Sequence, residues 1–135
     1  MLMKKLMLSL IIILPLLASC TKEKSPIYSS SLFGEWSWIS SCGGIAGICY
    51  TPTSTTQRIE LVFTSDSILN TYVNDTLYSS TRFQTYILPP ADLPGTPNVI
   101  RYNSSYQVTF SIVHDTLFLN DFCCDGFNSI YKRKK

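Results

Sequence analysis

From about residue 32 onward, apolar and polar residues alternate with a period of two, and Val, Ile, Thr, Tyr and Phe are frequent. This alternation is typical of strands with one buried face. No stretch of ten residues after position 20 repeats apolar residues at the three- and four-residue spacing of a surface helix. The pattern predicts eight strands: Phe33–Ser41, Thr56–Phe63, Ser67–Val73, Thr76–Ile87, Asn98–Tyr102, Ser105–Val113, Thr116–Asp121 and Phe127–Arg133.

Most connections between these strands are short. Asn74-Asp75 and His114-Asp115 fit two-residue hairpin turns, and only Cys42–Thr55 and Leu88–Pro97 are long. Short connections make successive strands adjacent and antiparallel. The sequence therefore predicts an all-β fold, an eight-stranded antiparallel up-and-down barrel, because closure of such a meander removes its exposed edges. A two-sheet sandwich is the alternative.

The first 19 residues have the pattern of a cleaved export signal. Lys4 and Lys5 precede an apolar run, Leu6–Leu17, which is too short to cross a bilayer as a helix. Leu17-Ala18-Ser19-Cys20 resembles the lipobox of bacterial lipoproteins, and this resemblance implies cleavage before Cys20 and lipid attachment to Cys20. We expect residues 1–19 to be a signal peptide, residues 20–31 a lipidated tether, and residues 32–133 one barrel domain. Position 21 is not aspartate, so we expect anchoring at the outer membrane, on its periplasmic face or its surface.

The charge distribution excludes one class of partner. Residues 27–131 contain three arginines and eight carboxylates, whereas the last four residues are all basic. A body that binds nucleic acid is expected to be basic, and this one is acidic. The membrane, contacted through the lipid anchor, is the partner that the sequence indicates.

Leu32-Phe33-Gly34-Glu35-Trp36 contains the Gly-x-Trp start of the lipocalins. Together with Gly43–Gly47, Tyr50-Thr51-Pro52 and the closing segments Asp115–Leu119 and Asp125–Arg133, it resembles the small lipocalin-like domains of bacterial lipoproteins. The resemblance spans nearly the whole chain after the tether. It implies a lipocalin-like eight-stranded barrel and a small apolar ligand.

Four cysteines remain after Cys20, an even number in an exported chain. Of the three possible pairings, the one containing Cys123–Cys124 joins chain neighbours. We favour the two pairings that link the first long loop to the last one. The return of the last strand beside the first would place Cys42 near Cys124 and Cys49 near Cys123. A zinc site is the alternative, but export disfavours free thiolates, so we expect no metal.

The predicted strands carry one consistent apolar face, formed by Trp36, Trp38, Ile59, Leu61, Phe63, Leu77, Phe83, Tyr106, Val108, Phe110, Leu117, Leu119, Phe127 and Tyr131. Eight strands enclose space for these side chains alone or for one small ligand. The small residues Ser40, Ser79, Thr81 and Ser129 on the same face favour a cavity. The candidate ligand-lining residues are Trp36, Trp38, Leu61, Phe63, Phe83, Phe110 and Tyr131.

No catalytic constellation is visible. His114 is the single histidine and lies in a predicted turn, and no Gly-rich phosphate loop or nucleophile elbow occurs. We therefore expect neither an enzyme nor a cofactor. Ser67, Thr76 and Thr116 each follow an aspartate and precede an apolar residue, which resembles an O-glycosylation motif of some Gram-negative exported proteins.

Two functions agree with these observations. The first is a lipid-anchored envelope barrel that binds a small apolar or amphipathic ligand. The second is a filled barrel that binds a protein partner through the disulfide-pinned Cys42–Thr55 loop. The sequence leaves both open.

Overall fold

The computed structural model describes residues 32–89, 97–103 and 105–135, and most of these residues lie in antiparallel strands. The strands are β1 (Gly34–Gly43), β2 (Ile48–Tyr50), β3 (Ile59–Phe63), β4 (Ile68–Val73), β5 (Thr76–Ile87), β6 (Asn98–Tyr102), β7 (Tyr106–Val113), β8 (Thr116–Asp121) and β9 (Phe127–Arg133). One short helix, α1 (Pro52–Thr55), lies between β2 and β3. The bounds of β5, β6, β8 and β9 coincide with those predicted from the alternation.

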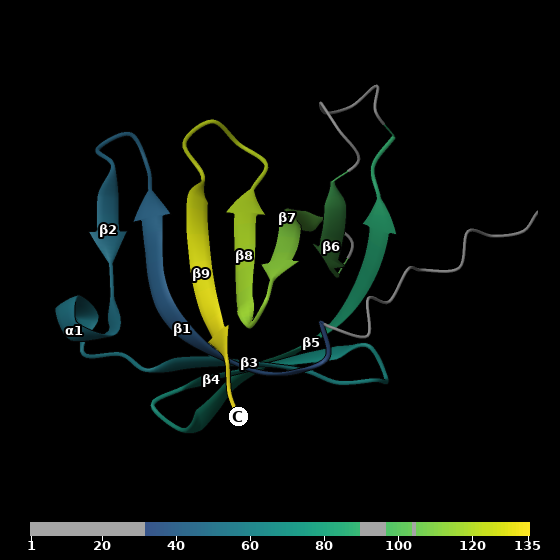
Figure 1. Cartoon of the computed structure of the whole chain (residues 1–135), viewed down its shortest axis with the longest axis horizontal. Helices are drawn as coiled ribbons and strands as arrows, with labels where there is room; N and C mark the ends of the chain where they lie inside the picture. Colours follow the sequence, from purple (N-terminus) through teal and green to yellow (C-terminus); the bar gives the residue numbers. More distant parts are fainter. Residues whose placement is uncertain (1–31, 90–96, 104) are drawn as a thin grey trace, which may run out of the picture.

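Eight of the strands form a closed barrel. Each pairs with its neighbour in the order β1-β3-β4-β5-β6-β7-β8-β9, and β9 then pairs with β1. The closing seam runs from Trp36 opposite Arg133 to Gly43 opposite Phe127, so β9 lies between β1 and β8 (Figure 1). The predicted up-and-down barrel is confirmed, and the sandwich alternative is wrong.

The tight turns adopt the backbone conformations that two-residue hairpins require. Asn74 and Asp75 both have positive φ, 49° and 64°, which is the combination of a type I′ turn. His114 has φ 54° in the turn between β7 and β8. Asn and Asp tolerate this left-handed region better than most residues, because their short polar side chains bond locally to the backbone.

The connection Cys42–Thr55, predicted as a loop, contains secondary structure. β2 pairs antiparallel with the upper half of β1 and lies outside the barrel, while β3 pairs with the lower half (Figure 1). Thr51 caps α1 by accepting a hydrogen bond from the Ser54 N–H at 3.2 Å. Thr56 was predicted to begin a strand, but it ends this helix with φ 57°, and β3 begins three residues later.

Two register shifts change which side chains face inward. One lies in β1 between Trp38 and Ser40, and it places Ser41, opposite Ser129, in the inward position expected for Ser40. The other lies between β4 and β5, where Thr71 pairs with Ser79 but Tyr72 pairs with Leu77. Leu77 is therefore 53% exposed, and its predicted place in the interior is wrong. An extra residue in one strand reverses the in–out alternation beyond it.

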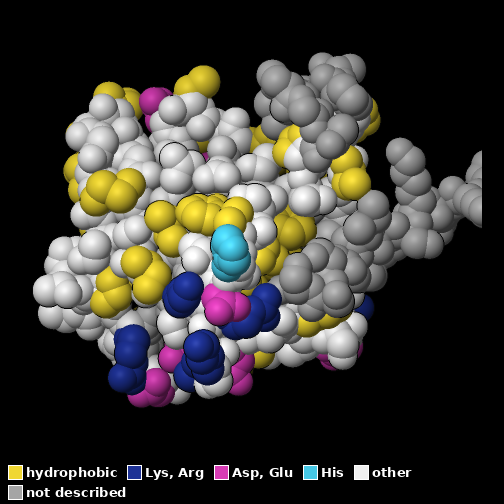
Figure 2. Space-filling view, in the orientation of Figure 1, with side chains coloured by type: hydrophobic (Ala, Val, Ile, Leu, Met, Phe, Trp, Pro, Cys, Tyr) yellow, Lys and Arg dark blue, Asp and Glu magenta, His cyan; other side chains and the backbone are white. Residues whose placement is uncertain are grey.

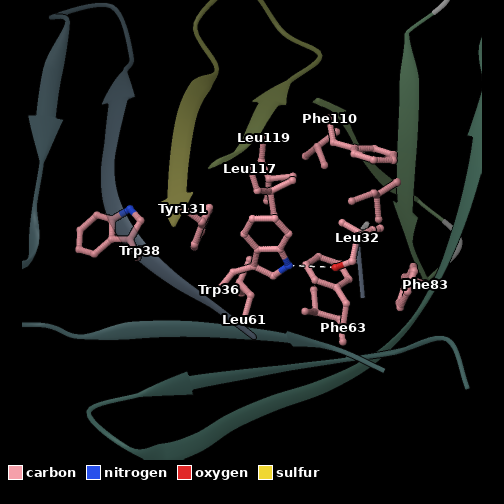
Figure 3. Packing of buried hydrophobic residues seen from close by; sticks show 13 residues of the cluster. Leu32, Trp36, Trp38, Leu61, Phe63, Phe83, Phe110, Leu117, Leu119 and Tyr131 are labelled. Atoms are coloured by element: carbon pink, nitrogen blue, oxygen red, sulfur yellow. Dashed lines mark hydrogen bonds between the residues drawn. The ribbon is translucent and has the colours of Figure 1, made fainter. Parts of the chain in front are cut away.

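Large apolar side chains fill the lower end of the barrel. Trp36, Phe63 and Phe83 are almost fully buried, and the two phenyl rings meet edge to face at 5.2 Å. The Trp36 indole N–H donates to the carbonyl of Leu32 at 2.9 Å (Figure 3). The guanidinium of Arg133 lies over the Trp36 ring, 4.0 Å from its centre. We call this packed layer the floor; it consists of Leu32, Trp36, Phe63, Phe83, Ile100, Phe110 and Leu117.

Candidate ligand-binding site

A cavity of about 510 Å³ lies above the floor. Its apolar wall comes from β3, β4, β7 and β8, and consists of Ile59, Leu61, Leu69, Val108 and Leu119. The cavity reaches the end of the barrel where β6 turns into β7, because the exposed residues Asn103 and Ser105 of that turn also line it. We call this end the mouth.

Hydroxyl groups line much of the rest of the cavity, on Thr71, Ser79, Thr81, Ser105 and Ser129 and on three tyrosines. Ser79, Thr81 and Ser129 are three of the four small interior residues that favoured a cavity in the sequence, so that part of the prediction is confirmed. The fourth, Ser40, does not line it, because the β1 register shift puts Ser41 in the inward position.

A polar chain connects one wall to the barrel seam. The Trp38 indole N–H donates to the Ser41 hydroxyl at 2.9 Å, and the Ser41 and Ser129 oxygens are hydrogen bonded at 2.7 Å. Ser129 and Tyr131 both line the cavity on β9. These bonds fix the wall hydroxyls in place, since neighbouring groups in such a chain orient one another.

Tyr102, Tyr106 and Asp121 meet at the mouth. The rings of Tyr102 and Tyr106, opposite each other on β6 and β7, stack with centroids 5.8 Å apart. The Tyr106 hydroxyl donates to one oxygen of the Asp121 carboxylate. The backbone N–H of Phe127 donates to the other oxygen at 2.9 Å. The carboxylate is thus held from two sides at the upper edge of the cavity.

The three tyrosines remain neutral at physiological pH. Burial raises the pKa of Tyr131 to about 12, although a hydrogen bond with Ser129 acts in the opposite direction. Burial also raises the pKa of Tyr102 and Tyr106, and the charge of Asp121 adds to the shift in both. Among the described residues that line the cavity, Asp121 carries the single carboxylate, and none is Lys, Arg or His.

The cavity and the predicted ligand-lining set overlap only in part. Leu61 and Tyr131 line the cavity. The other five do not line it, and this is a correction: they pack in the apolar core, and four of them, Trp36, Phe63, Phe83 and Phe110, belong to the floor. Large aromatic side chains fill a narrow barrel, whereas smaller ones leave space. The remaining residue, Trp38, is buried in the core and donates its N–H to Ser41, which is hydrogen bonded to the lining residue Ser129 (Figure 3 shows the Trp38 ring).

Sequence reasoning missed Tyr102 and Asp121 as site residues. Both are the last residues of their strands, next to turns, and strand-end aspartates were interpreted as turn formers. A usable signal exists in the alternation. Leu117 and Leu119 face inward, so the same period places Asp121 inward as well.

The cysteine pairing differs from the predicted one. Cys42 and Cys49 form a disulfide with each other, with Cα atoms 4.1 Å apart, and Cys123 and Cys124 are exposed free thiols. The predicted bridges from Cys42 to Cys124 and from Cys49 to Cys123 are therefore wrong. The physical reason is β2: the tight turn Gly44–Gly47 brings the chain straight back, so that Cys49 lies directly opposite Cys42.

The disulfide arrangement can be checked by mass. The unfolded, unreduced chain is expected to weigh about 2 Da less than the reduced chain, since one disulfide forms with loss of two hydrogens. Iodoacetamide applied before reduction should label Cys123 and Cys124 but neither Cys42 nor Cys49. Two bridges would give a deficit of about 4 Da and would contradict the observed pairing.

The other predicted positions have mixed outcomes. Cys20, the signal segment 1–19 and the tether 20–31 lie outside the described residues, so lipid attachment stays a prediction. Thr76 is exposed, while Ser67 and Thr116 are partly buried, and their glycosylation also stays a prediction. His114 is exposed at the surface (Figure 2).

The described part of the chain contains no cluster of three or more potential metal-ligating side chains. Within the same residues, no helix has the length and apolar character needed to cross a membrane. Comparison of the chain with protein-family models, with curated proteins and with solved structures returned no match.

Proposed function

We propose that this protein is a lipid-anchored cell-envelope barrel that binds a small amphipathic molecule in its cavity. The observation that carries the proposal is the polarity gradient of the cavity walls. Leu61 and Leu69 lie next to the floor, opposite Trp36 and Phe63 on the neighbouring strands, whereas Tyr102, Tyr106 and Asp121 lie at the mouth. A molecule with an apolar tail and a polar head fits this gradient in one orientation.

The size and the fold support a ligand rather than an empty space. Pockets for small molecules have volumes of about 300–1,000 Å³ and combine apolar walls with a few polar groups. The cavity of about 510 Å³ lies within this range. Eight-stranded barrels have interiors that side chains fill or that hold one small ligand. Here the floor is filled and the upper half is not.

The anchoring part of the proposal rests on the sequence of residues 1–20. The short apolar run and Leu17-Ala18-Ser19-Cys20 support export followed by lipid attachment. Several acyl chains hold a protein on a membrane stably, which would keep the cavity close to envelope lipids and to molecules that partition there.

The Cys42–Thr55 segment gives the second candidate function, binding of a protein partner. Ile45, in the turn that the disulfide pins, is 91% exposed, and Ile48 and Tyr50 of β2 are also exposed. Apolar groups held rigidly in water are typical of contact surfaces. The unfilled cavity favours ligand binding as the first function.

Calorimetry with 1-octanol tests the ligand-binding proposal. Full-length protein in phosphatidylcholine nanodiscs is expected to show saturable binding of one octanol per chain, beyond the partitioning into empty nanodiscs. Ser79→Trp places a large ring in the cavity and should weaken binding at least about tenfold, because the pocket volume is lost.

Ser80→Trp is the matched control. It adds the same ring one residue later, at an exposed position on the outer face of β5, and octanol binding should stay at the wild-type level. Absence of saturable binding to the wild type would overturn the proposal. Equal binding by Ser79→Trp would place the ligand elsewhere and would overturn it as well.

A further inference from the structure

The cavity has an unbalanced charge at its mouth. Asp121 lines it, and no Lys, Arg or His does so among the described lining residues. A carboxylate at a partly enclosed site is strongly stabilised by a nearby positive charge, because the local dielectric constant is lower than that of water. Among the described lining residues none supplies this positive charge, so a cationic ligand can supply it.

The existing partners of Asp121 hold the carboxylate but do not neutralise it. The Tyr106 hydroxyl donates to one oxygen and the Phe127 N–H to the other, and both donors are uncharged. The two oxygens of a carboxylate accept about four hydrogen bonds, so capacity remains for a ligand. The bonds also fix the position of the negative charge, which reduces the reorganisation that binding requires.

The aromatic groups around Asp121 favour the same kind of ligand. Tyr102, Tyr106 and Tyr131 all line the cavity, and a cation is attracted to the negative face of an aromatic ring. A tyrosine hydroxyl is neutral at physiological pH, and burial raises the pKa of all three further, so they add no negative charge of their own. Aromatic rings are the usual surroundings of bound quaternary ammonium groups, and here a carboxylate lies beside them.

We infer that the cavity selects an amphiphile with a cationic head group, a quaternary or protonated amine. The ammonium group would lie beside Asp121 and the tyrosine rings, and the alkyl part would lie against Leu61 and Leu69, next to the floor. Anionic amphiphiles such as fatty acids are disfavoured, since their carboxylate would face Asp121. This inference rests on the proposed function, because it names the ligand class of the same cavity.

Three ligands with the same chain length test the inference: octyltrimethylammonium, 1-octanol and octanoate, titrated into the full-length protein in phosphatidylcholine nanodiscs. The cation is expected to bind about tenfold more tightly than octanol, because it adds a charge pair and ring contacts. Octanoate is expected to bind more weakly than octanol. In Asp121→Asn the preference for the cation should fall at least about fivefold while octanol binding changes less than about twofold.

Two further variants complete the test, the first of them as a control. Asp125→Asn removes an exposed carboxylate of the loop between β8 and β9 that does not line the cavity, so the preference should persist. Tyr106→Phe keeps the carboxylate and the ring but removes one of the two hydrogen bonds that position Asp121, so the preference for the cation should fall by less than in Asp121→Asn while octanol binding stays at the wild-type level; an unchanged preference would overturn the role given to this bond. This variant tests the inference even where Asp121→Asn unfolds, which far-UV circular dichroism would reveal.

Each outcome decides between the two proposals. Octanol binding without a preference for the cation overturns the inference and leaves the ligand-binding function standing. Equal loss of octanol and cation binding in folded Asp121→Asn means that the residue only supports the wall, and it overturns the inference. Absence of binding by all three ligands overturns the proposed function and the inference with it.

Discussion

Trp36→Ala is expected to lower the free energy of unfolding by about 3–5 kcal/mol, as large-to-small changes of buried aromatic residues do. The Trp36 side chain has no exposed surface, and it packs in the floor beside Leu61, Phe63 and Leu117 (Figure 3). Its removal leaves a cavity and leaves the Leu32 carbonyl without its donor. It also removes the ring on which the Arg133 guanidinium lies. Urea unfolding followed by far-UV circular dichroism measures the change.

Two other variants are expected to lose less stability than Trp36→Ala and serve as comparisons. Trp36→Phe keeps an aromatic ring beside Arg133 and loses the N–H, so we expect an intermediate loss of about 1–3 kcal/mol. Ile45→Ala changes a residue that is 91% exposed and is expected to stay within about 0.5 kcal/mol of the wild type. If Trp36→Ala were no less stable than Ile45→Ala, the floor would not be the stabilising core of the barrel.

The architecture was predictable because strand alternation and turn chemistry are local signals. The run Thr76–Ile87 reads as one strand from its period of two, and Asn74-Asp75 before it supplies the two residues that tolerate positive φ. Short connections then left few ways to arrange eight strands. The closing pair of β1 and β9 follows from the fold as a whole rather than from any motif.

The register shifts were not predictable from the same signals. An extra residue in a strand leaves no compositional mark, yet it moved Ser41 inward in place of Ser40 and left Leu77 outside. The ligand-lining residues were predicted only in part correctly for a related reason. Sequence gives the inward face of each strand but not the height of each residue along the barrel axis, so floor residues such as Phe83 were grouped with wall residues such as Leu61.

The disulfide was missed because the pairing argument treated Cys42–Thr55 as one open loop. The three-residue strand β2 is too short for alternation to indicate it. Once Gly44 and Gly47, both with positive φ, turn the chain back on itself, the pairing of Cys42 with Cys49 needs no long-range contact. A local hairpin therefore forms the bridge that the barrel closure was expected to form.

Gly43→Ala is expected to destabilise the barrel by about 1–3 kcal/mol, the usual range for overpacking a closely fitted site. A Cβ atom at Gly43 would lie 2.2 Å from the Gly126 carbonyl oxygen and 2.8 Å from the Phe127 Cα. Both are backbone atoms, so no side-chain rotation relieves the contact. The upper end of β9 must move away from β1, at the last pair of the closing seam.

The same displacement should reach the cavity, because the Phe127 N–H donates to Asp121. We therefore expect Gly43→Ala to weaken octyltrimethylammonium binding as well as stability, and to increase hydrogen exchange at the Phe127 amide. Gly47→Ala is the control: its φ is +60°, so alanine strains the hairpin, but an added Cβ meets nothing within 4 Å. It should leave Phe127 protection and cation binding unchanged. Unchanged Phe127 exchange in Gly43→Ala would show that the seam at this end tolerates a wider spacing, and that the position of Asp121 does not depend on it.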